Sequence, residues 1–487
     1  MNSKTPTALA IFVLGILTAC EQPKKQETQT FPAPSGNAVN RLSPEGLDQR
    51  NVYRRAVQAV IWGMPAVNAD LMYQAMVNQA HGGPNQIVFW SKFPDWRDQT
   101  LTPNPNAIYL MPFINTKDAG PMVLEIPRAS TEGSITGNLD DIWQVALDDI
   151  GPTGADKGKG GKYLILPPGY KQKTPAGYLP MPSDTYQNYA LIRSIPASGS
   201  DTDVAKALVY GKRVKLYPLS QAAHPPETTY VDATNGIFDS TIPYDLRYFE
   251  SLNRIVQAEP WLERDKTMID QLKSIGIEKG KPFSPDSKMQ DELKQAAAEA
   301  HDWLDAKYES IFTPYFDGAH WAVPAAPDVV QGQSNFYADP NSYDVDARAV
   351  TYSIGYIGIK HLGGGQFYLM TSKAKDGQSL SGANTYRLTI PLNAPVKQYW
   401  SATAYDRATH ALIRNMQRAS RASNDPGLQK NPDGSVDIYF APKAPVGKDS
   451  NWVPTNPNGN FEVLFRLYGP EESLFDKTWK LPDIEKM

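Results

Sequence analysis

Two stretches of the chain, residues 107–215 and 366–470, are made of short apolar runs in which apolar and polar residues alternate. Proline and glycine bound these runs, and because both residues interrupt regular pairing, each run is limited to the length of a short strand. The runs at 122–126, 163–166 and 189–192 show this pattern. Short strands at such close spacing are typical of antiparallel sandwiches and barrels.

The two stretches repeat each other in sequence order. Four runs of the first stretch match four runs of the second, and one match places a tryptophan and an aspartate six residues apart in both copies. The matched pairs are 121–127 with 386–391, 143–149 with 400–406, 162–167 with 436–442, and 189–196 with 461–470. The repeat predicts two related β-sandwich modules.

Apolar residues follow a helical period before and between the two stretches. Residues 46–80 contain two such runs, which the Gly-Met-Pro sequence at 63–65 is expected to divide into two helices. We therefore expect a mainly β protein with helical segments (α+β), in which two antiparallel, jelly-roll-like β-sandwich domains form the body. The expected parts are a signal peptide at 1–19, a disordered tether at 20–45, an N-terminal helical segment at 46–100, a first module at 101–235, a helical connection at 236–345 and a second module at 346–487.

The first twenty residues have the pattern of an export signal. Lys4 precedes an apolar run at 8–17 that is too short to span a bilayer. Residues 17–20 read Leu-Thr-Ala-Cys and resemble the bacterial lipobox, whose cysteine is lipidated; a simple signal peptide with an incidental cysteine is the alternative. Glu21, where an aspartate would favour the inner membrane, indicates the outer membrane. We expect anchoring in the bacterial cell envelope through membrane lipid on Cys20, facing the periplasm.

Composition excludes several classes of protein. The chain has 487 residues with 48 basic and 52 acidic side chains, a net charge of −4 and no long basic stripe, so nucleic-acid binding is not expected. One cysteine rules out a disulfide framework and a multi-cysteine metal site. The six histidines do not stand at metal-ligand spacing, and no nucleophile elbow or phosphate-binding loop occurs. We expect no cofactor and no metal, although a metal site assembled from distant segments stays open.

Two aspartates and a group of amide and aromatic residues are the candidate site residues. Asp149 and Asp406 stand at the ends of expected strands, where a carboxylate can serve acid–base catalysis or simply cap a turn. Amide and aromatic side chains near strand edges can hydrogen-bond to a ligand and stack on it, and asparagine equally satisfies loop backbone. The candidate ligand-binding residues are Asn104, Asn106, Tyr109, Asn451 and Trp452.

These residues also resemble a known pair of families. Residues 101–109 and the following strand to Pro127 are similar to the opening of domain of unknown function 1254 (DUF1254), and residues 399–406 and 451–454 are similar to DUF1214. The resemblance implies two antiparallel β-sandwich domains and no settled reaction. The first family's usual Asn-x-Asp-Thr reads Asn-Pro-Asn-Ala at 104–107, so activity would be in doubt if that aspartate were catalytic.

Three functions stay open at the level of the sequence. The leading hypothesis is an exported, lipid-anchored β-sandwich protein that binds a small polar or aromatic-polar ligand in uptake or envelope metabolism. The second is a hydrolase or lyase that uses Asp149 or Asp406. The third is a structural or assembly lipoprotein. The sequence leaves open which ligand binds, whether the protein is an enzyme, and whether it forms a homo-oligomer.

Overall fold

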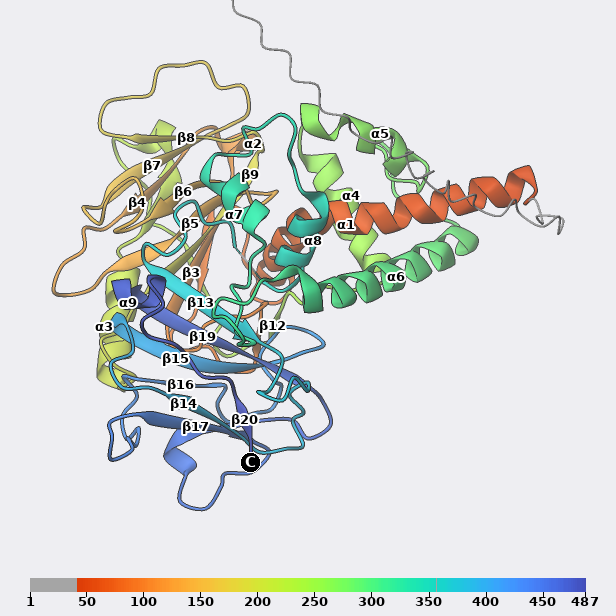
Figure 1. Ribbon diagram of the computed structural model, residues 1–487. Coiled ribbons are helices and arrows are strands. Elements are labelled where there is room, and N and C mark those ends of the chain that lie inside the picture. Colours follow the sequence, from red (N-terminus) through yellow and green to blue (C-terminus); the bar gives the residue numbers. More distant parts are fainter. Residues whose placement is uncertain (1–41, 356) are drawn as a thin grey trace, which may run out of the picture. The chain divides into compact units, whose positions relative to one another are not determined.

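The computed structural model describes residues 42–355 and 357–487 (Figure 1). The expected signal peptide, the lipidation site Cys20 and nearly all of the expected tether lie outside the described residues. The chain divides into a unit Met1–Asp48 and a unit Gln49–Met487. Both sheet-containing modules lie within the second unit.

The first module is a sandwich of a six-stranded and a four-stranded sheet. Because side chains alternate along each strand, one apolar set from each sheet, including Leu110, Leu124 and Ile165, is buried between the two sheets. The six-stranded sheet has the order β11 (Tyr230–Asp232), β1 (Gln86–Phe89), β3 (Ile108–Asn115), β9 (Gln187–Ser194), β5 (Ile135–Asp141) and β6 (Ala146–Ile150). The four-stranded sheet has the order β10 (Lys215–Pro218), β4 (Met122–Ile126), β7 (Gly161–Leu166) and β8 (Leu179–Pro182).

The second module is a sandwich of two four-stranded sheets. Its core lies between them and contains Leu388, Phe440 and Phe465. One sheet has the order β13 (Gln366–Thr371), β19 (Phe461–Pro470), β15 (Val396–Asp406) and β16 (Ser420–Ala422), and the other has the order β18 (Trp452–Pro454), β17 (Val436–Ala441), β14 (Tyr386–Ile390) and β20 (Glu485–Lys486). Two short strands, β2 (Asp98–Gln99) and β12 (Phe238–Asp239), pair with each other in parallel.

The sheets of the second module repeat the order and direction of eight strands of the first module, to which β1 and β11 are added. In the larger sheet of the first module β9 pairs antiparallel with β3 and β5, and in the second module β19 pairs antiparallel with β13 and β15. In the other sheets β7 and β17 pair antiparallel with β4 and β14, and parallel with β8 and β18. The prediction of two antiparallel β-sandwich domains with helical segments is confirmed.

Strand register gives the equivalent residues in the two modules. Arg193 on β9 lies opposite Tyr109 on β3, and Arg466 on β19 lies opposite Tyr368 on β13. With these two arginines aligned, β5 in the first module corresponds to β15 in the second. The register therefore defines a pair of arginine–tyrosine positions that the two modules have in common.

The same register corrects one of the four matches in the sequence repeat. Asp406 on β15 corresponds to Asp141 on β5, and Asp149 belongs to the next strand, β6. Trp143 lies in a tight turn before β6, where Gln144 has a φ of 56°, and the strand begins only at Ala146. Short apolar runs carry little information, so a similar spacing of tryptophan and aspartate arose in strands that are not equivalent.

Helices pack on the face of the six-stranded sheet that points away from the sandwich core. Figure 1 shows α1, α4, α6 and α8 gathered on one side of the strands. The helices are α1 (Pro44–Asn78), α2 (Thr116–Ala119), α3 (Asp201–Gly211), α4 (Leu246–Ala258), α5 (Lys266–Lys273), α6 (Ser287–Ile311), α7 (Pro327–Ser334), α8 (Val345–Ser353) and α9 (Glu472–Phe475). Across residues 42–355 and 357–487, no helix combines the length and the apolar character that crossing a membrane requires.

Helix α1 continues through Pro65, so the prediction of two helices in this region was wrong. Pro65 cannot donate a backbone hydrogen bond to the preceding turn. Two side chains from outside the helix donate to its backbone near this point: the Tyr248 hydroxyl donates to the carbonyl of Val60 at 2.6 Å, and Gln144 Nε2 donates to the carbonyl of Pro65 at 2.8 Å. Residues 59–70 are all buried, so packing on all sides of the helix outweighs the local cost of proline.

Candidate functional site

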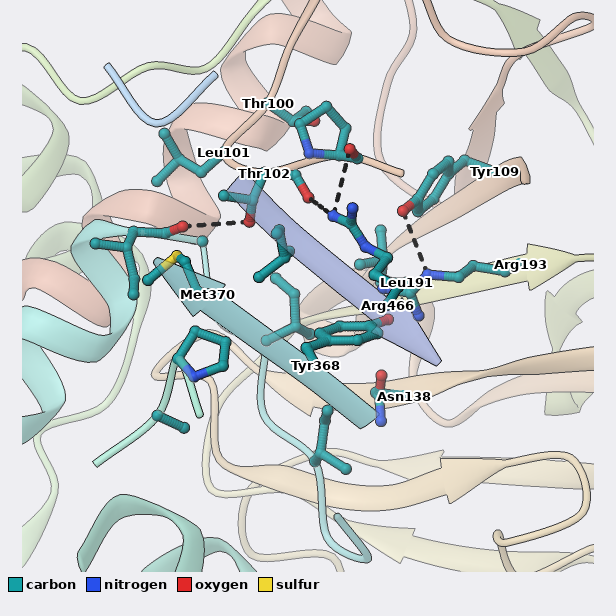
Figure 2. A pocket seen from close by; sticks show the side chains of 18 of the residues that line it. Thr100, Leu101, Thr102, Tyr109, Asn138, Leu191, Arg193, Tyr368, Met370 and Arg466 are labelled. Atoms are coloured by element: carbon teal, nitrogen blue, oxygen red, sulfur yellow. Dashed lines mark hydrogen bonds between the residues drawn. The ribbon is translucent and has the colours of Figure 1, made fainter. Parts of the chain in front are cut away.

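A cavity lies between the two modules, bounded by β3, β5 and β9 of the first and by β13 and β19 of the second (Figure 2). It contains about 920 Å³ of space not filled by atoms, counted out to its opening to solvent. We call it the inter-module cavity. Its lining is mostly apolar and includes Met72, Trp90, Met111, Leu191, Ile354 and Met370.

Two buried arginines line this apolar cavity. Arg193 is 6% exposed and Arg466 is 2% exposed. Arg193 Nε donates to the Tyr109 hydroxyl at 3.3 Å, and its guanidinium carbon lies 5.3 Å from the centre of that ring. Figure 2 shows both arginines and their tyrosines at the same end of the cavity. The first module thus supplies one guanidinium group to the cavity and the second module supplies the other.

Neutral oxygens are the hydrogen-bond partners of both guanidinium groups in the described part of the chain. Arg466 Nη2 donates to the carbonyl of Thr102 at 2.7 Å, and Arg466 Nη1 donates to Thr403 Oγ1 at 3.2 Å. No ion pair joins Arg193 or Arg466 to a carboxylate within residues 42–355 and 357–487. Two buried positive charges therefore lie beside one cavity without a negative partner.

Two buried polar atoms at the cavity wall have no hydrogen-bond partner among the described residues: Nη1 of Arg193 and Oδ1 of Asn138. They come from neighbouring strands, because Asn138 on β5 lies opposite Leu191 on β9. Asn138 is held in place by its Nδ2 group, which donates to Asp149 Oδ1 at 2.9 Å. A buried polar atom without a partner is costly. The donor on Arg193 and the acceptor on Asn138 are therefore available to a ligand.

Asp98 is the carboxylate that lines the inter-module cavity. It is 3% exposed, and its Oδ1 accepts hydrogen bonds from the backbone and the hydroxyl of Thr100. Burial raises the pKa of Asp98 to about 7, although the two hydrogen bonds from Thr100 oppose that shift. Its charge therefore changes near neutral pH.

Three of the five predicted ligand-binding residues lie at the junction of the two modules. Tyr109 lines the inter-module cavity. Asn104 is fully buried and donates from Nδ2 to the hydroxyls of Tyr399 and Tyr468, at 2.9 Å each. Asn106 is 9% exposed, and its Oδ1 accepts from Ser420 Oγ at 2.8 Å. The segment that carries these residues thus holds the second module against the first.

A short relay of hydrogen bonds joins Asn106 to Arg466. Arg466 Nη1 donates to Thr403 Oγ1, which donates to Ser420 Oγ at 3.1 Å, and Ser420 donates to Asn106 Oδ1. All four residues are buried. Three consecutive hydrogen bonds therefore connect residue 106 to Arg466, although residue 106 does not line the inter-module cavity.

The other two predicted ligand-binding residues do not line the inter-module cavity: Asn451 ends the short turn before β18, and Trp452 is the first residue of β18. The side-chain amide of Asn451 is hydrogen-bonded to backbone: Nδ2 donates to the carbonyls of Gln429 and Asp437, at 2.8 Å each. Trp452 Nε1 donates to the carbonyl of Ala441 at 2.8 Å. Both side chains thus hold local backbone in place.

The two predicted catalytic aspartates have different surroundings. Asp149 is 1% exposed, and its Oδ2 accepts from the backbone and from Nδ1 of His361, at 2.8 and 2.9 Å. Asp406 accepts from the backbone of Ala408 at 2.9 Å, which is an ordinary turn cap. Only Asp149 is linked to the inter-module cavity, through its hydrogen bond with Asn138. Within the described residues, no group of three histidine, cysteine, aspartate or glutamate side chains is placed to hold a metal ion.

Comparison with protein families agrees with this duplicated topology. The model of the family of unknown function DUF1254 matches residues 84–218, and the model of the family of unknown function DUF1214 matches residues 365–472. The chain carries both modules. The DUF1254 match covers β1 to β10, and the DUF1214 match covers β13 to β19. The two-module resemblance found in the sequence is confirmed.

Two solved structures match most of the length of the chain. The crystal structure of the VPA0106 protein from Vibrio parahaemolyticus is 19% identical, has a TM-score of 0.54, and is matched over 90% of this chain and 100% of its own. An uncharacterised protein from Burkholderia cenocepacia is 12% identical, with a TM-score of 0.38, and is matched over 91% of this chain and 95% of its own. No curated protein matches the chain. The likeness to the Vibrio protein shows a shared fold.

Sequence reasoning missed the residues that give the inter-module cavity its polarity. In the DUF1254 module these are Asn138 and Arg193, and in the DUF1214 module they are Tyr368 and Arg466. A signal was present, because each arginine interrupts an apolar strand in two runs that the repeat had already matched. Charged side chains are rarely buried without a partner, so an arginine kept at the same place in two apolar strands indicates a site.

Proposed function

We propose that this protein binds a small organic anion with an apolar body in the inter-module cavity. The observation that supports this is the pair of buried guanidinium groups, Arg193 and Arg466, beside one cavity and without a carboxylate partner in the described chain. Removing a charge from water costs several kcal/mol unless an opposite charge accompanies it. A ligand carboxylate would supply that charge and would accept a hydrogen bond from the free Nη1 of Arg193.

The remaining wall favours an apolar body on the ligand. Three methionines, Met72, Met111 and Met370, line the cavity together with aliphatic side chains and Trp90. Methionine is flexible and polarisable, so it adapts to ligands of different shape. Small-molecule sites usually have a largely apolar wall that carries a few polar groups. An aromatic acid or a short fatty acid has the required combination of charge and apolar surface.

Calorimetric titration of the purified chain tests this proposal with three probes of similar size. Phenylacetate, phenethyl alcohol and phenethylamine share an aromatic body and differ in the charge of the head. We expect phenylacetate to bind at least about tenfold more tightly than the alcohol, and Arg193→Gln to abolish that preference. Arg348→Gln is the matched control, because Arg348 is equally buried but donates to the carbonyl of Trp143 outside this cavity. Equal affinity for phenylacetate and the alcohol would refute the proposal.

We also propose that the chain is exported and anchored to the cell envelope through lipid on Cys20. The support is the pattern of the first twenty residues, where an apolar run precedes Leu-Thr-Ala-Cys. Labelling cells with a fatty-acid analogue and fractionating them tests it. The wild-type protein should carry the label and sediment with membranes, and Cys20→Ser should lose both properties. Unlabelled protein in the cytosol would contradict the proposal.

A hydrolase is a second candidate function, favoured by the pairing of Asp149 with His361. Asp149 is buried and accepts from Nδ1 of His361, whose side chain is 52% exposed. A carboxylate on one imidazole nitrogen orients the ring and leaves the other nitrogen free for proton transfer. Hydrolysis of nitrophenyl esters tests this idea: turnover should be lost in Asp149→Asn and kept in Asp406→Asn. Turnover that survives Asp149→Asn would exclude the pair.

A further inference from the structure

A second cavity lies beside α6 and has a different chemistry. Its lining includes Tyr244, His301, Asp305, Tyr308 and His410. It contains about 610 Å³ of space not filled by atoms, counted out to solvent. We call it the α6 cavity. It shares Leu101 with the inter-module cavity, and its other lining residues are different.

His410 is fixed at the wall of the α6 cavity from two sides. Its Nδ1 lies 2.8 Å from Oε1 of Glu462, which is fully buried. Its carbonyl accepts from the backbone of Thr102 at 2.7 Å, and its φ of 56° is in the left-handed region, which is uncommon for residues other than glycine. The tautomer of the ring that carries its hydrogen on Nδ1 fits this contact, because Nδ1 then donates to the Glu462 carboxylate. Nε2 then presents a lone pair, and it has no hydrogen bond in the described part of the chain.

Two more polar groups at this wall have no hydrogen-bond partner within residues 42–355 and 357–487. They are the Tyr244 hydroxyl and the ring nitrogens of His301, and the two rings lie 4.2 Å apart, centre to centre. A cluster that served only to attach α6 to the second module would use its polar atoms on the protein. Tyr308 does so, because its hydroxyl donates to Glu462 Oε2 at 2.7 Å. Tyr244, His301 and Nε2 of His410 do not.

The charges around the α6 cavity leave one carboxylate in excess. Arg407 pairs with Asp305 at 2.7 Å and with Glu309 at 3.2 Å. Lys373 also pairs with Glu309, at 3.0 Å. Two cations therefore face these two acids, and Glu462 is hydrogen-bonded to His410 and Tyr308 and also interacts electrostatically with Arg407. The local electrostatic field favours a positively charged ligand.

We propose that the α6 cavity is a second binding site and that it takes a small organic ammonium ion. The ammonium group donates to Nε2 of His410, whose ring is polarised by the buried Glu462 behind it. The aromatic rings of Tyr244 and His301 cover the apolar part of the ligand, and the face of a tyrosine ring attracts cations. This site uses none of the charged groups of the anion site.

Phenethylamine is the probe, in calorimetric titration against the same chain. We expect it to bind the wild-type protein and to bind at least about tenfold more weakly to Glu462→Gln and to His410→Gln. Arg193→Gln should leave its affinity unchanged, whereas that variant should lose phenylacetate. Absence of binding, wild-type affinity in both α6-cavity variants, or competition with phenylacetate would each overturn the proposal. Failure of phenylacetate to bind would count against the anion site alone.

A second measurement does not depend on variants that remove buried groups. The chain has six histidines, and their ring signals can be followed by nuclear magnetic resonance in the wild-type protein. Single substitutions of His81, His224, His320 and His361 assign four signals, and the remaining two belong to His301 and His410. Phenethylamine should shift the signals of His301 and His410 and leave those of His224 and His361 unchanged. Shifts at other histidines without shifts at His301 and His410 would overturn the proposal.

Discussion

Arg193 and Arg466 occupy equivalent positions in the two modules and line the same cavity. Each lies opposite a tyrosine on the neighbouring strand, Tyr109 and Tyr368, and the guanidinium carbons lie 5.3 and 5.2 Å from those rings. The equivalence ends at the hydrogen bonds, because Arg466 donates to the Thr102 carbonyl and Arg193 keeps Nη1 without a partner in the described chain. Equivalent positions of the two modules thus place two arginines around one site, and Arg193 keeps a buried donor without a partner in the described chain.

Arg193→Met should stabilise the empty protein and abolish its binding of phenylacetate. The substitution removes a buried charge that lacks a negative partner, and we expect a gain of about 1–3 kcal/mol in the free energy of unfolding. Arg466→Met is the matched control and should destabilise the protein, since it leaves the partly buried carbonyl of Thr102 without its donor, at a cost of about 1–3 kcal/mol. Urea denaturation measures both. Equal destabilisation by the two substitutions would contradict the functional interpretation of Arg193.

Asn106→Asp should weaken the binding of phenylacetate about three- to tenfold while the protein stays folded. The substitution restores the aspartate usual in the DUF1254 family and keeps an acceptor for Ser420. Its negative charge is joined through Ser420 and Thr403 to Arg466, so it partly cancels the positive charge of the cavity. Calorimetry measures the affinity, and circular dichroism checks the fold. Tighter binding in Asn106→Asp would show that the positive charge does not recruit the ligand.

Asp98→Asn should change how stability depends on pH. The folded protein keeps a proton on Asp98 up to about pH 7, whereas the unfolded chain releases it near its ordinary pKa of 3.8. The contribution of this group to stability is therefore fully present below about pH 4 and is lost as pH rises towards 7. Relative to Asp98→Asn, the wild type should lose about 1–4 kcal/mol across that window. Urea denaturation at several pH values measures this, and parallel curves for the two proteins would refute it.

Tyr248→Phe should destabilise the protein by about 1–2 kcal/mol. The hydroxyl of Tyr248 donates to the carbonyl of Val60 inside α1, close to the hydrogen bond that Pro65 removes from the helix. Tyr170→Phe is the control, because that hydroxyl bonds at an exposed position to Gln172 at 3.4 Å, and its loss should change stability by less than about 0.5 kcal/mol. Urea denaturation compares them. An equal, small effect of both substitutions would mean that α1 tolerates Pro65 without help from Tyr248.

The strands could be predicted because they depend on local pattern. The run at 386–390 alternates apolar and polar residues, and in the structure it forms β14 with Tyr386, Leu388 and Ile390 buried. The same reasoning gave a wrong prediction for α1, where it placed a break at Pro65. There the local preference for a break was overruled by contacts with Tyr248 and Gln144, which are distant in sequence.

The amino-acid sequence determined two sandwich modules, their order and the junction segment that contains Asn104, Asn106 and Tyr109. It did so because alternation and turn residues act over a few positions of the chain. Tertiary structure alone decided that Arg193 and Arg466 share a cavity, and that Glu462 lies behind His410. Those relations join strands and helices far apart in sequence. They depend on register and packing, which local pattern does not encode.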